Sequence, residues 1–518
     1  MKKLNNLSIS FFQAVLIMLF SCFLQSCSEL DKTKKDNING FYADDGAYEI
    51  INYDGRSDVI KVDGAKTSWA VVMYSLAKYK GKMITIELTA EVKREGSAGN
   101  LLWQINDGQN YPLITSLNNA VAGVWHQMKG RIVITPSGND FFVYLTNWEN
   151  NAENTTYYVY NPTVNIIEGN PLIPDLSLLP LKSVYENHFL MGNIIDTTYL
   201  SGKYFDLLKH HFNIVTPGNN LKPDFLAPST KGDAYQWTTA EEMVNKMISN
   251  NIAVHGHVLV WHEQTPSWMT VGTRTEVETT MKNYIAEVLT HFQGRVNSWD
   301  VVNEAIKDGL SSSDIASGWK NCVRTSANPW YDALGADYIE LAFRAAREAD
   351  PNINLYYNDY GLENTNKAEA VRIMIKDIND RYKNETSGTR NLIDGVGSQA
   401  HVNISLNINN VRESLNKLFS LGIEVSITEL DVSTINNYDP GSGRDSVISE
   451  ANENAQAKVY AELFKLYIEN ASQITRVTFW GMDDGNSWLS VGNPCLFDWR
   501  LTAKRAFFAV SNPDNFLP

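Results

Sequence analysis

Short apolar runs alternate with longer amphipathic segments along the C-terminal two thirds of the chain. Eight runs rich in β-branched, Leu and aromatic residues have the length of buried strands, and helical patterns separate them. The strand candidates are residues 189–195, 214–219, 253–261, 298–304, 354–359, 395–401, 424–431 and 476–480, and the helical patterns include 240–249, 276–291, 338–348, 411–421 and 452–470. This alternation predicts an α/β fold, a (β/α)8 TIM barrel over residues 185–518.

The preceding 130 residues have a different rhythm. Short alternating runs recur between Gly, Asn and Asp turns, and this spacing predicts a small all-β sandwich domain over residues 37–169. The runs are 57–62, 69–74, 83–92, 100–105, 126–135, 140–145 and 157–167. Residues 170–184 are rich in proline and are expected to form a linker in front of the barrel.

The N-terminus reads as a targeting segment. Lys2 and Lys3 precede an apolar run over residues 9–24, which ends in Leu-Gln-Ser-Cys27. We therefore expect residues 1–27 to be a signal peptide with a lipobox, in which Cys27 is lipidated; ordinary cleavage and secretion is the alternative. Residues 28–36 read as a polar tether. These features predict a secreted lipoprotein of a bacterial cell envelope, at the surface or periplasmic face of the outer membrane, held there by its lipid anchor only.

Composition excludes several classes of protein. A net charge of −15 argues against nucleic-acid partners, and 43% hydrophobic with 20% charged residues excludes a polytopic membrane protein. Cys322 and Cys495, which follow the leader, are too few for a disulfide framework. His255, His257 and His262 form a conceivable metal set, but no nearby carboxylate or cysteine completes it in the sequence, so we expect no metal and no cofactor.

Polar and aromatic residues collect where the predicted strands end. Parallel strands of a barrel bring their C-terminal ends to one mouth, so these side chains are expected to share a site. They are Asn219, Lys222, His257, Trp261, His262, Asn303, Glu304, Gln399, His401, Glu429, Asp431 and Trp480.

Glu304 and Glu429 end strands that lie across the mouth from each other. Paired carboxylates are what cleavage of a glycosidic bond requires, one as proton donor and one as nucleophile. His401 is placed to hydrogen-bond Glu429 and to be fixed by Asp431, and Asn303 is placed to reach a sugar hydroxyl. Asn358-Asp-Tyr360, at the end of another strand, suits either substrate contact or loop capping.

Several motifs together resemble glycoside hydrolase family 10. They are Trp-Asp-Val-Val-Asn-Glu304, Gly-His-Val-Leu-Val-Trp-His262, Gly-Val-Gly-Ser-Gln-Ala-His401, Thr-Glu-Leu-Asp431 and Phe-Trp-Gly481. The resemblance covers residues 185–515 and implies a retaining endo-β-1,4-xylanase. It implies Glu304 as acid/base and Glu429 as nucleophile. The sugar-binding residues it implies include Asn219, Lys222, His257, Trp261, His262, Gln399, Trp480 and Trp488.

Two positions depart from that family's pattern. Gly218 stands where a glutamate is usual, and Leu489 where an arginine is common. Xylan or decorated xylan is therefore the expected substrate. The alternatives are another β-linked glycan, cut by the same retaining chemistry, and a weakly active surface glycan-binding protein.

The sandwich resembles carbohydrate-binding modules of families 4 and 22 through the segments 123–130, 134–138 and 158–167. Glycan binding there would use Trp69, Trp103, Trp125 or Trp148, whereas a spacer domain would hold them in its core. In the barrel, Trp319 and Trp330 form either a distal sugar platform or pins for their loop.

Overall fold

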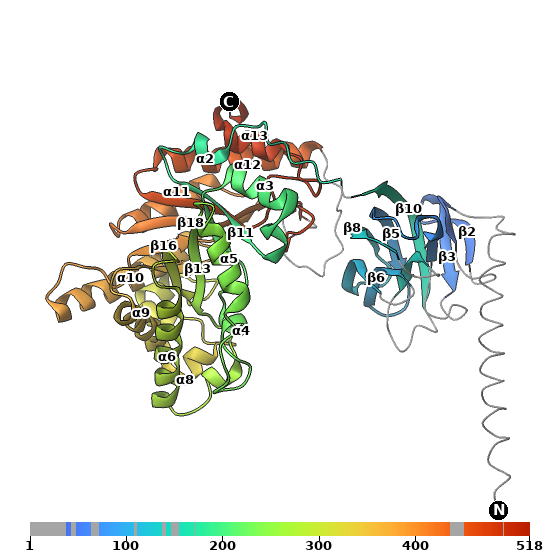
Figure 1. Cartoon of the computed structure of the whole chain (residues 1–518). Helices are drawn as coiled ribbons and strands as arrows, with labels where there is room; N and C mark the ends of the chain where they lie inside the picture. Colours follow the sequence, from blue (N-terminus) through green and yellow to red (C-terminus); the bar gives the residue numbers. More distant parts are fainter. Residues whose placement is uncertain are drawn as a thin grey trace, which may run out of the picture. The chain divides into compact units, whose positions relative to one another are not determined.

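The computed structural model describes residues 38–42, 48–63, 72–107, 111–136, 141–146, 155–169, 171–435, 450–489 and 492–517. The described residues fall into two compact units that divide at residue 170 (Figure 1). Cys27, the expected signal peptide and the polar tether lie outside the described residues. Within the described part, no helix has the length and apolar character needed to cross a membrane.

The N-terminal unit is a pair of antiparallel sheets, as the alternating pattern predicts. One sheet has the strand order β1 (Phe41–Tyr42), β4 (Val72–Ser75), β9 (Phe142–Thr146), β6 (Gly99–Asn106), β7 (Leu113–Ala120). The other has the order β2 (Tyr48–Tyr53), β3 (Arg56–Asp63), β10 (Thr156–Glu168), β5 (Ile84–Arg94), β8 (Trp125–Ile134). Alternate residues such as Leu88, Ala90 and Val92 of β5 are buried in one apolar core, whereas Glu91 between them is not.

The C-terminal unit is a closed parallel barrel. Its strands are β11 (Leu190–Ile195), β12 (Ile214–Pro217), β13 (Ala253–Val260), β14 (Ser298–Asn303), β15 (Asn354–Asp359), β16 (Gly395–Ser398), β17 (His401–Asn403), β18 (Glu424–Ser433) and β19 (Ile474–Phe479). Each pairs in parallel with its neighbour, and the pairing of β16 with β18 completes the ring. β16 and β17 are two pieces of the sixth barrel strand, interrupted at Gln399-Ala400, where Ala400 has a φ of 60°.

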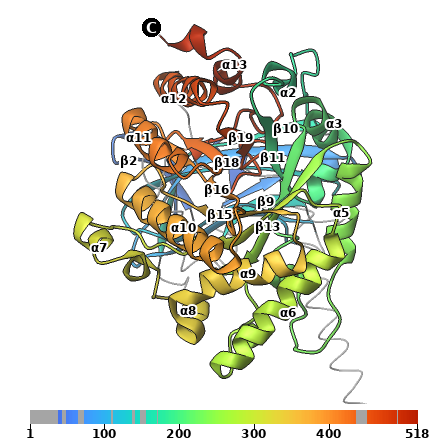
Figure 2. The same ribbon diagram turned by 90° about the vertical axis from the view of Figure 1, so that its left-hand side faces the viewer.

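Helices surround the barrel strands (Figure 2). They are α2 (Leu181–Val184), α3 (Gly202–His211), α4 (Pro223–Leu226), α5 (Thr238–Ile248), α6 (Arg274–Phe292), α7 (Ser312–Ala316), α8 (Pro329–Leu334), α9 (Tyr338–Ala349), α10 (Thr365–Thr386), α11 (Ile408–Phe419), α12 (Glu450–Glu469) and α13 (Arg505–Ser511). Helix α6 begins in a capping box, in which the Thr273 side chain and the Glu276 carboxylate satisfy each other's backbone N–H groups.

The expected linker differs from the structure. Residues 171–184 belong to the barrel unit, because Leu172 and Leu181 are buried in the barrel's apolar core. The backbone N–H of Ile173 donates to the carbonyl of Arg500 at 2.8 Å. Residues 171–180 form neither helix nor strand, α2 begins at Leu181, and the buried leucines attach the segment to the barrel.

Candidate active site

A cleft of about 810 Å³ opens where the barrel strands end. Eleven of the residues expected at the site line this cleft: Asn219, Lys222, His257, Trp261, Asn303, Glu304, Gln399, His401, Glu429, Trp480 and Trp488. His257 and Glu429 lie within β13 and β18, and the other residues lie at or beyond the C-terminal ends of their strands, which a parallel barrel brings to one mouth.

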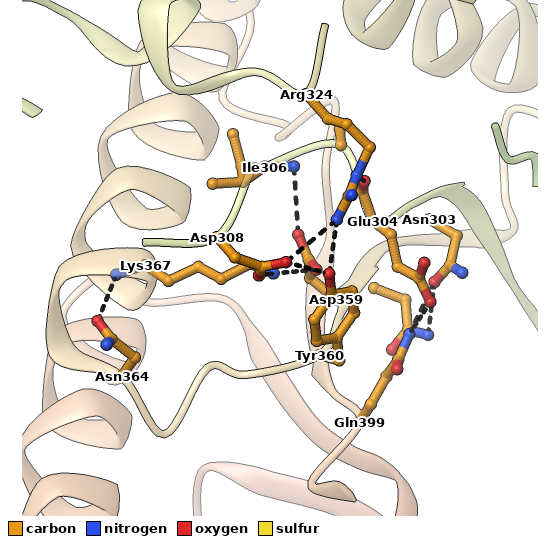
Figure 3. Close-up of polar contacts among 12 residues, drawn as sticks. Asn303, Glu304, Ile306, Asp308, Arg324, Asp359, Tyr360, Asn364, Lys367 and Gln399 are labelled. Atoms are coloured by element: carbon orange, nitrogen blue, oxygen red, sulfur yellow. Dashed lines mark hydrogen bonds and ion pairs between the residues drawn. The ribbon is translucent and has the colours of Figure 1, made fainter. Parts of the chain in front are cut away.

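Glu304 directly follows β14 and is held at both carboxylate oxygens. Its Oε2 accepts the indole N–H of Trp261 at 2.9 Å, and its Oε1 accepts an amide N–H of Gln399 at 2.9 Å. The same Gln399 amide also lies 3.2 Å from Oδ1 of Asn303 (Figure 3). These donors fix the rotamer of Glu304 from the ends of β13 and β16, which lie on opposite sides of β14 in the strand order.

The backbone at Glu304 is also constrained. Its φ is 57°, a left-handed conformation that a glutamate rarely adopts. The N–H of Ala305 and the N–H of Ile306 both donate to the hydroxyl of Tyr357, at 3.0 and 3.2 Å. The guanidinium of Arg324 donates to the carbonyl of Glu304 at 3.3 Å. Backbone strain at a residue that points into a cleft is maintained only when its surroundings hold it, as they do here.

An ionic cluster centred on the buried side chains of Asp359 and Lys367 lies next to this turn (Figure 3). Oδ2 of Asp359 accepts the N–H of Ile306 at 3.3 Å, and its Oδ1 lies 3.0 Å from the ammonium of Lys367. Lys367 also donates to Asp308 at 2.8 Å and lies 3.7 Å from the ring centre of Tyr360. Burial raises the pKa of Asp359 to about 6, although the Lys367 charge opposes the shift.

Glu429 lies on β18 and is almost fully buried at the bottom of the cleft. Its Oε1 accepts the amide N–H of Asn358 at 2.8 Å, and its Oε2 lies 3.3 Å from Nε2 of His401. Burial acts to raise the pKa of Glu429, but the hydrogen bond with His401 and the charge of His257 outweigh it, so the pKa is lowered. Glu429 is therefore held as a carboxylate.

His401 is fixed in turn by Asp431. Its Nδ1 lies 2.9 Å from Oδ2 of Asp431, which also accepts the indole N–H of Trp488 at 3.0 Å. Burial acts to lower the pKa of His401, but the charges of Asp431 and Glu429 raise it to about 10. The sequence predicts this chain of contacts, in which Asp431 binds His401 and His401 binds Glu429.

Asn358 is a member of the site that the sequence left undecided between substrate contact and loop capping. It donates to Asn303 at 2.9 Å and to Glu429 at 2.8 Å, and it accepts the hydroxyl of Thr428 at 2.7 Å. Asn358 is fully buried and so links the strands of the two glutamates from below.

Asp300 is a residue of the site to which the sequence assigned no role. It lies in the middle of β14, and the register of β13 on β14 sets His257 beside it. Its Oδ2 is 2.9 Å from Nδ1 of His257 and its Oδ1 is 3.0 Å from Nε2 of His255. Burial and the charge of Arg476 lower the pKa of His255 to about 4. The two histidines thus bind a carboxylate, and no group of metal-ligating residues occurs in the described part of the chain.

Lys222 and Asn219 lie together in the loop after β12. The Lys222 ammonium donates to Oδ1 of Asn219 at 3.1 Å and to Oε1 of Gln264 at 2.8 Å, and it lies 4.9 Å from the Trp261 ring centre. Burial lowers the pKa of Lys222, and the charges of Glu429 and Glu304 oppose that shift. These contacts place a cation and an amide beside the carboxylates.

His262 does not line the cleft, contrary to the expectation. Strand β13 ends at Val260, so the alternation of sides along the strand no longer applies at His262. Its ring packs edge-on against Trp261, with centroids 5.8 Å apart, and is largely buried.

Trp319 and Trp330 anchor the loop after β14. Trp330 is fully buried and donates to the carbonyl of Trp261 at 3.0 Å, and Trp319 is buried and donates to Asp377 at 2.9 Å. Neither ring is presented as a sugar platform. Cys322 and Cys495 are buried free thiols.

In the sandwich, Trp103 lies in the apolar core, and Trp69 and Trp148 lie outside the described residues. Trp125 lies on the outer side of β8, donates to Asp54 at 2.8 Å, and is covered by the Arg56 guanidinium at 4.4 Å. Glycan binding by this domain stays a prediction.

Two carboxylates at the ends of barrel strands, one of them held ionised by a histidine, define a site of the glycoside hydrolase type. The model of glycosyl hydrolase family 10 matches residues 180–513, so the chain belongs to that family.

Relatives named as xylanases are similar to this chain. The endo-1,4-beta-xylanase A of Thermoanaerobacterium saccharolyticum is 32% identical over 437 residues, which cover 80% of this chain and 34% of that protein. The beta-1,4-xylanase of Dictyoglomus thermophilum is 35% identical over 339 residues, which cover 64% of this chain and 90% of that protein. This chain thus spans about a third of the length of several curated relatives that it matches.

Solved structures agree with the fold. A bacterial Ig-like domain containing GH10 xylanase from termite gut is 31% identical, with a TM-score of 0.61, and the match covers 81% of this chain and 94% of that one. An intracellular xylanase of T. saccharolyticum, solved as a mutant with xylotetraose, is 33% identical with a TM-score of 0.57, covering 65% of this chain and 100% of that one.

Proposed function

We propose that this protein is a retaining endo-β-1,4-xylanase that hydrolyses internal linkages of xylan or decorated xylan. The observation that carries the proposal is the pair Glu304 and Glu429 in one cleft, each held by a different set of hydrogen-bond partners. Relatives named as xylanases, and a related structure solved with xylotetraose, support xylan as the substrate.

In the first step, a carboxylate oxygen of Glu429 attacks the anomeric carbon. The bond from that carbon to the bridging oxygen breaks as Glu304 gives its proton to this oxygen, and the shortened chain leaves as an alcohol. A glycosyl ester of Glu429 remains. His401 and Asn358 aim the nucleophile because each binds one of its two oxygens.

In the second step, Glu304 is a carboxylate and takes a proton from water. That water attacks the anomeric carbon from the side the leaving group vacated, the ester bond to Glu429 breaks, and the sugar is released with its original configuration. The donors on Glu304, from Trp261 and Gln399, suit this ionised form, since an ionised carboxylate accepts two such hydrogen bonds.

The proposal is tested by the products. Digestion of xylohexaose followed by proton NMR should give the β-anomer first and internal fragments rather than xylose alone. The α-anomer as first product would overturn the retaining step. Turnover of mannan or mixed-linkage glucan without turnover of any xylan would favour the second candidate, a retaining glycosidase of another β-linked glycan, which the glycine at position 218 motivates. Glycan affinity without any product would favour a binding protein.

We propose in addition that the protein is anchored to the bacterial envelope through Cys27. The support is the sequence of the leader, which places Cys27 after an apolar run and a small residue. Expression with labelled palmitate should label the wild type and not Cys27→Ala. Equal labelling of both would refute the anchor.

A further inference from the structure

Gly218 and Ile194 occupy neighbouring places in the cleft wall. Ile194 lies on β11 and Gly218 follows β12, where its N–H donates to the carbonyl of Ile195 at 3.0 Å. Both residues line the cleft, next to Asn219. A Cβ built on Gly218 would lie 2.5 Å from Cδ1 and 2.9 Å from Cγ1 of Ile194. No side chain is compatible with that spacing while Ile194 stays where it is.

The backbone is not the reason for the glycine. Gly218 is absent from the residues with positive φ, so its conformation is open to any amino acid. Space is the reason, because the isoleucine side chain fills the volume that a side chain at 218 would occupy. The two positions are therefore coupled: the Ile194 side chain forms the cleft wall, and the absence of a side chain at Gly218 leaves space for it.

The consequence is a change of chemistry in this wall. Asn219 and Lys222 bring an amide and an ammonium to the same end of the cleft, and they hydrogen-bond to each other. Ile194, which is partly exposed, presents only methyl and methylene groups. A sugar hydroxyl pressed against it loses water without gaining a partner, which is unfavourable. A hydroxyl capped as an ester presents a methyl group and no donor, and burying that group is favourable.

We propose that the Ile194–Gly218 pair makes this end of the cleft select a sugar unit whose hydroxyl is acylated over one whose hydroxyl is free. This inference rests on the proposed xylanase function and names the decoration that the cleft accepts. Ile194 is then a specificity-determining residue, and position 218 is a glycine because the Ile194 side chain needs the space.

The test uses one substrate in two forms. Acetylated xylo-oligosaccharides are compared with the same sample after mild alkaline removal of the esters, and kcat/KM is measured for each on the full-length protein. The wild type should favour the acetylated form by several fold. The double variant Ile194→Ala/Gly218→Glu vacates the space and fills it with a carboxylate, so the ratio of the two kcat/KM values should fall about tenfold, which corresponds to about 1.4 kcal/mol.

Two single variants complete the set. Ile194→Val keeps an apolar, branched wall and should retain the wild-type ratio. Ile194→Thr has the shape of Ile194→Val but carries a hydroxyl in place of one methyl group, so it should lower the ratio even if the double variant fails to fold. An unchanged ratio in Ile194→Thr, or a wild type that favours the de-esterified form, overturns the inference and leaves the xylanase function standing. Lack of turnover of both forms overturns both.

Discussion

The phenol oxygen of Tyr357 lies 3.0 Å from the backbone nitrogen of Ala305, the residue after Glu304. It accepts the next N–H as well, and it donates its own proton to Asp359. One buried hydroxyl thus holds the turn that carries Glu304, the proposed general acid. A positively charged or polar neighbour acting on the carboxyl itself would tune its proton affinity, whereas Tyr357 acts on its position.

Replacement Tyr357→Phe should therefore impair proton donation more than nucleophilic attack. We expect kcat on xylan to fall roughly 10–100-fold, since misplacement of a catalytic group by about 1 Å costs about that much. Dinitrophenyl xylobioside, whose leaving group needs no proton, should lose less than about threefold in its glycosylation rate. Steady-state and pre-steady-state rates on both substrates measure the split.

Tyr284→Phe is the matched control for that prediction. Its hydroxyl is buried in α6 and has no hydrogen-bond partner in the described part of the structure, so its loss should leave both substrates unaffected. Equal losses on xylan and on the activated substrate in Tyr357→Phe would show a general structural defect instead of a positioning role.

The nucleophile can be distinguished from the acid by chemical rescue. Glu429→Ala should lower kcat by at least ~10⁴-fold, because the covalent step has no substitute. Added azide should restore turnover of an activated aryl xylobioside and give an α-azide product. Glu304→Ala with azide should instead give the β-azide, because the glycosyl ester still forms. Identical products from both variants would contradict the assigned roles.

Much of this site follows from the sequence because a parallel barrel places strand ends together. Glu304, Glu429 and His401 are polar residues at the ends of apolar runs, so topology alone predicts that they meet. The fold is predictable for the same reason, since eight β-rich runs separated by helical patterns admit few other arrangements. Chemistry then follows from the residue types at one mouth.

The rest depends on register and side-chain volume, which alternation does not reveal. Asp300 reads as one polar residue within an apolar run, and only the pairing of β13 with β14 puts it between two histidines. His262 was expected in the cleft, but the strand ends before it. The Ile194 side chain fills the space next to the Cα of Gly218, although the two residues are 24 positions apart in the chain. No periodicity of the sequence predicts this contact.

The buried ammonium of Lys367 leads to a prediction about the stability of the barrel. It is buried and is shared by Asp308 and Asp359 at 2.8 and 3.0 Å. Lys367→Met would leave Asp359 without its cation, which should destabilise the barrel by about 3 kcal/mol at pH 7. The folded-state pKa of Asp359, raised to about 6, lies above its unfolded value. The stability of the folded protein therefore falls as pH rises from the unfolded-state pKa of Asp359 to about 6. The Lys367→Met variant should show a larger fall.

Urea unfolding at pH 5 and pH 7.5 measures this effect. Adding Asp359→Asn to Lys367→Met should recover part of the loss at pH 7.5, because the unpaired charge is gone. The exposed pair of Lys376 and Asp380 supplies the control, and Lys376→Met should change stability by no more than about 0.5 kcal/mol. A Lys367→Met variant as stable as wild type would refute the role of the cluster.

His401 should make the stability of the barrel fall at alkaline pH. Its folded-state pKa is raised to about 10 by Asp431 and Glu429, above the unfolded value near 6.5. The stabilisation is therefore complete below about pH 6.5 and is lost as pH rises through about 10. The pKa of Glu429 is lowered in the folded state and so has the opposite effect on stability. The stabilisation from Glu429 is lost as pH falls below the pKa of this carboxyl in the unfolded chain.

Scanning calorimetry from pH 7 to 10.5 measures the alkaline limb. The wild-type Tm should fall by at least about 2 °C more than that of His401→Asn, because the variant has no proton to lose at this position. His188→Asn is the control, since that imidazole is exposed to solvent, and its Tm should follow the wild type. The same alkaline slope in wild type and His401→Asn would mean that His401 does not hold its proton between Glu429 and Asp431.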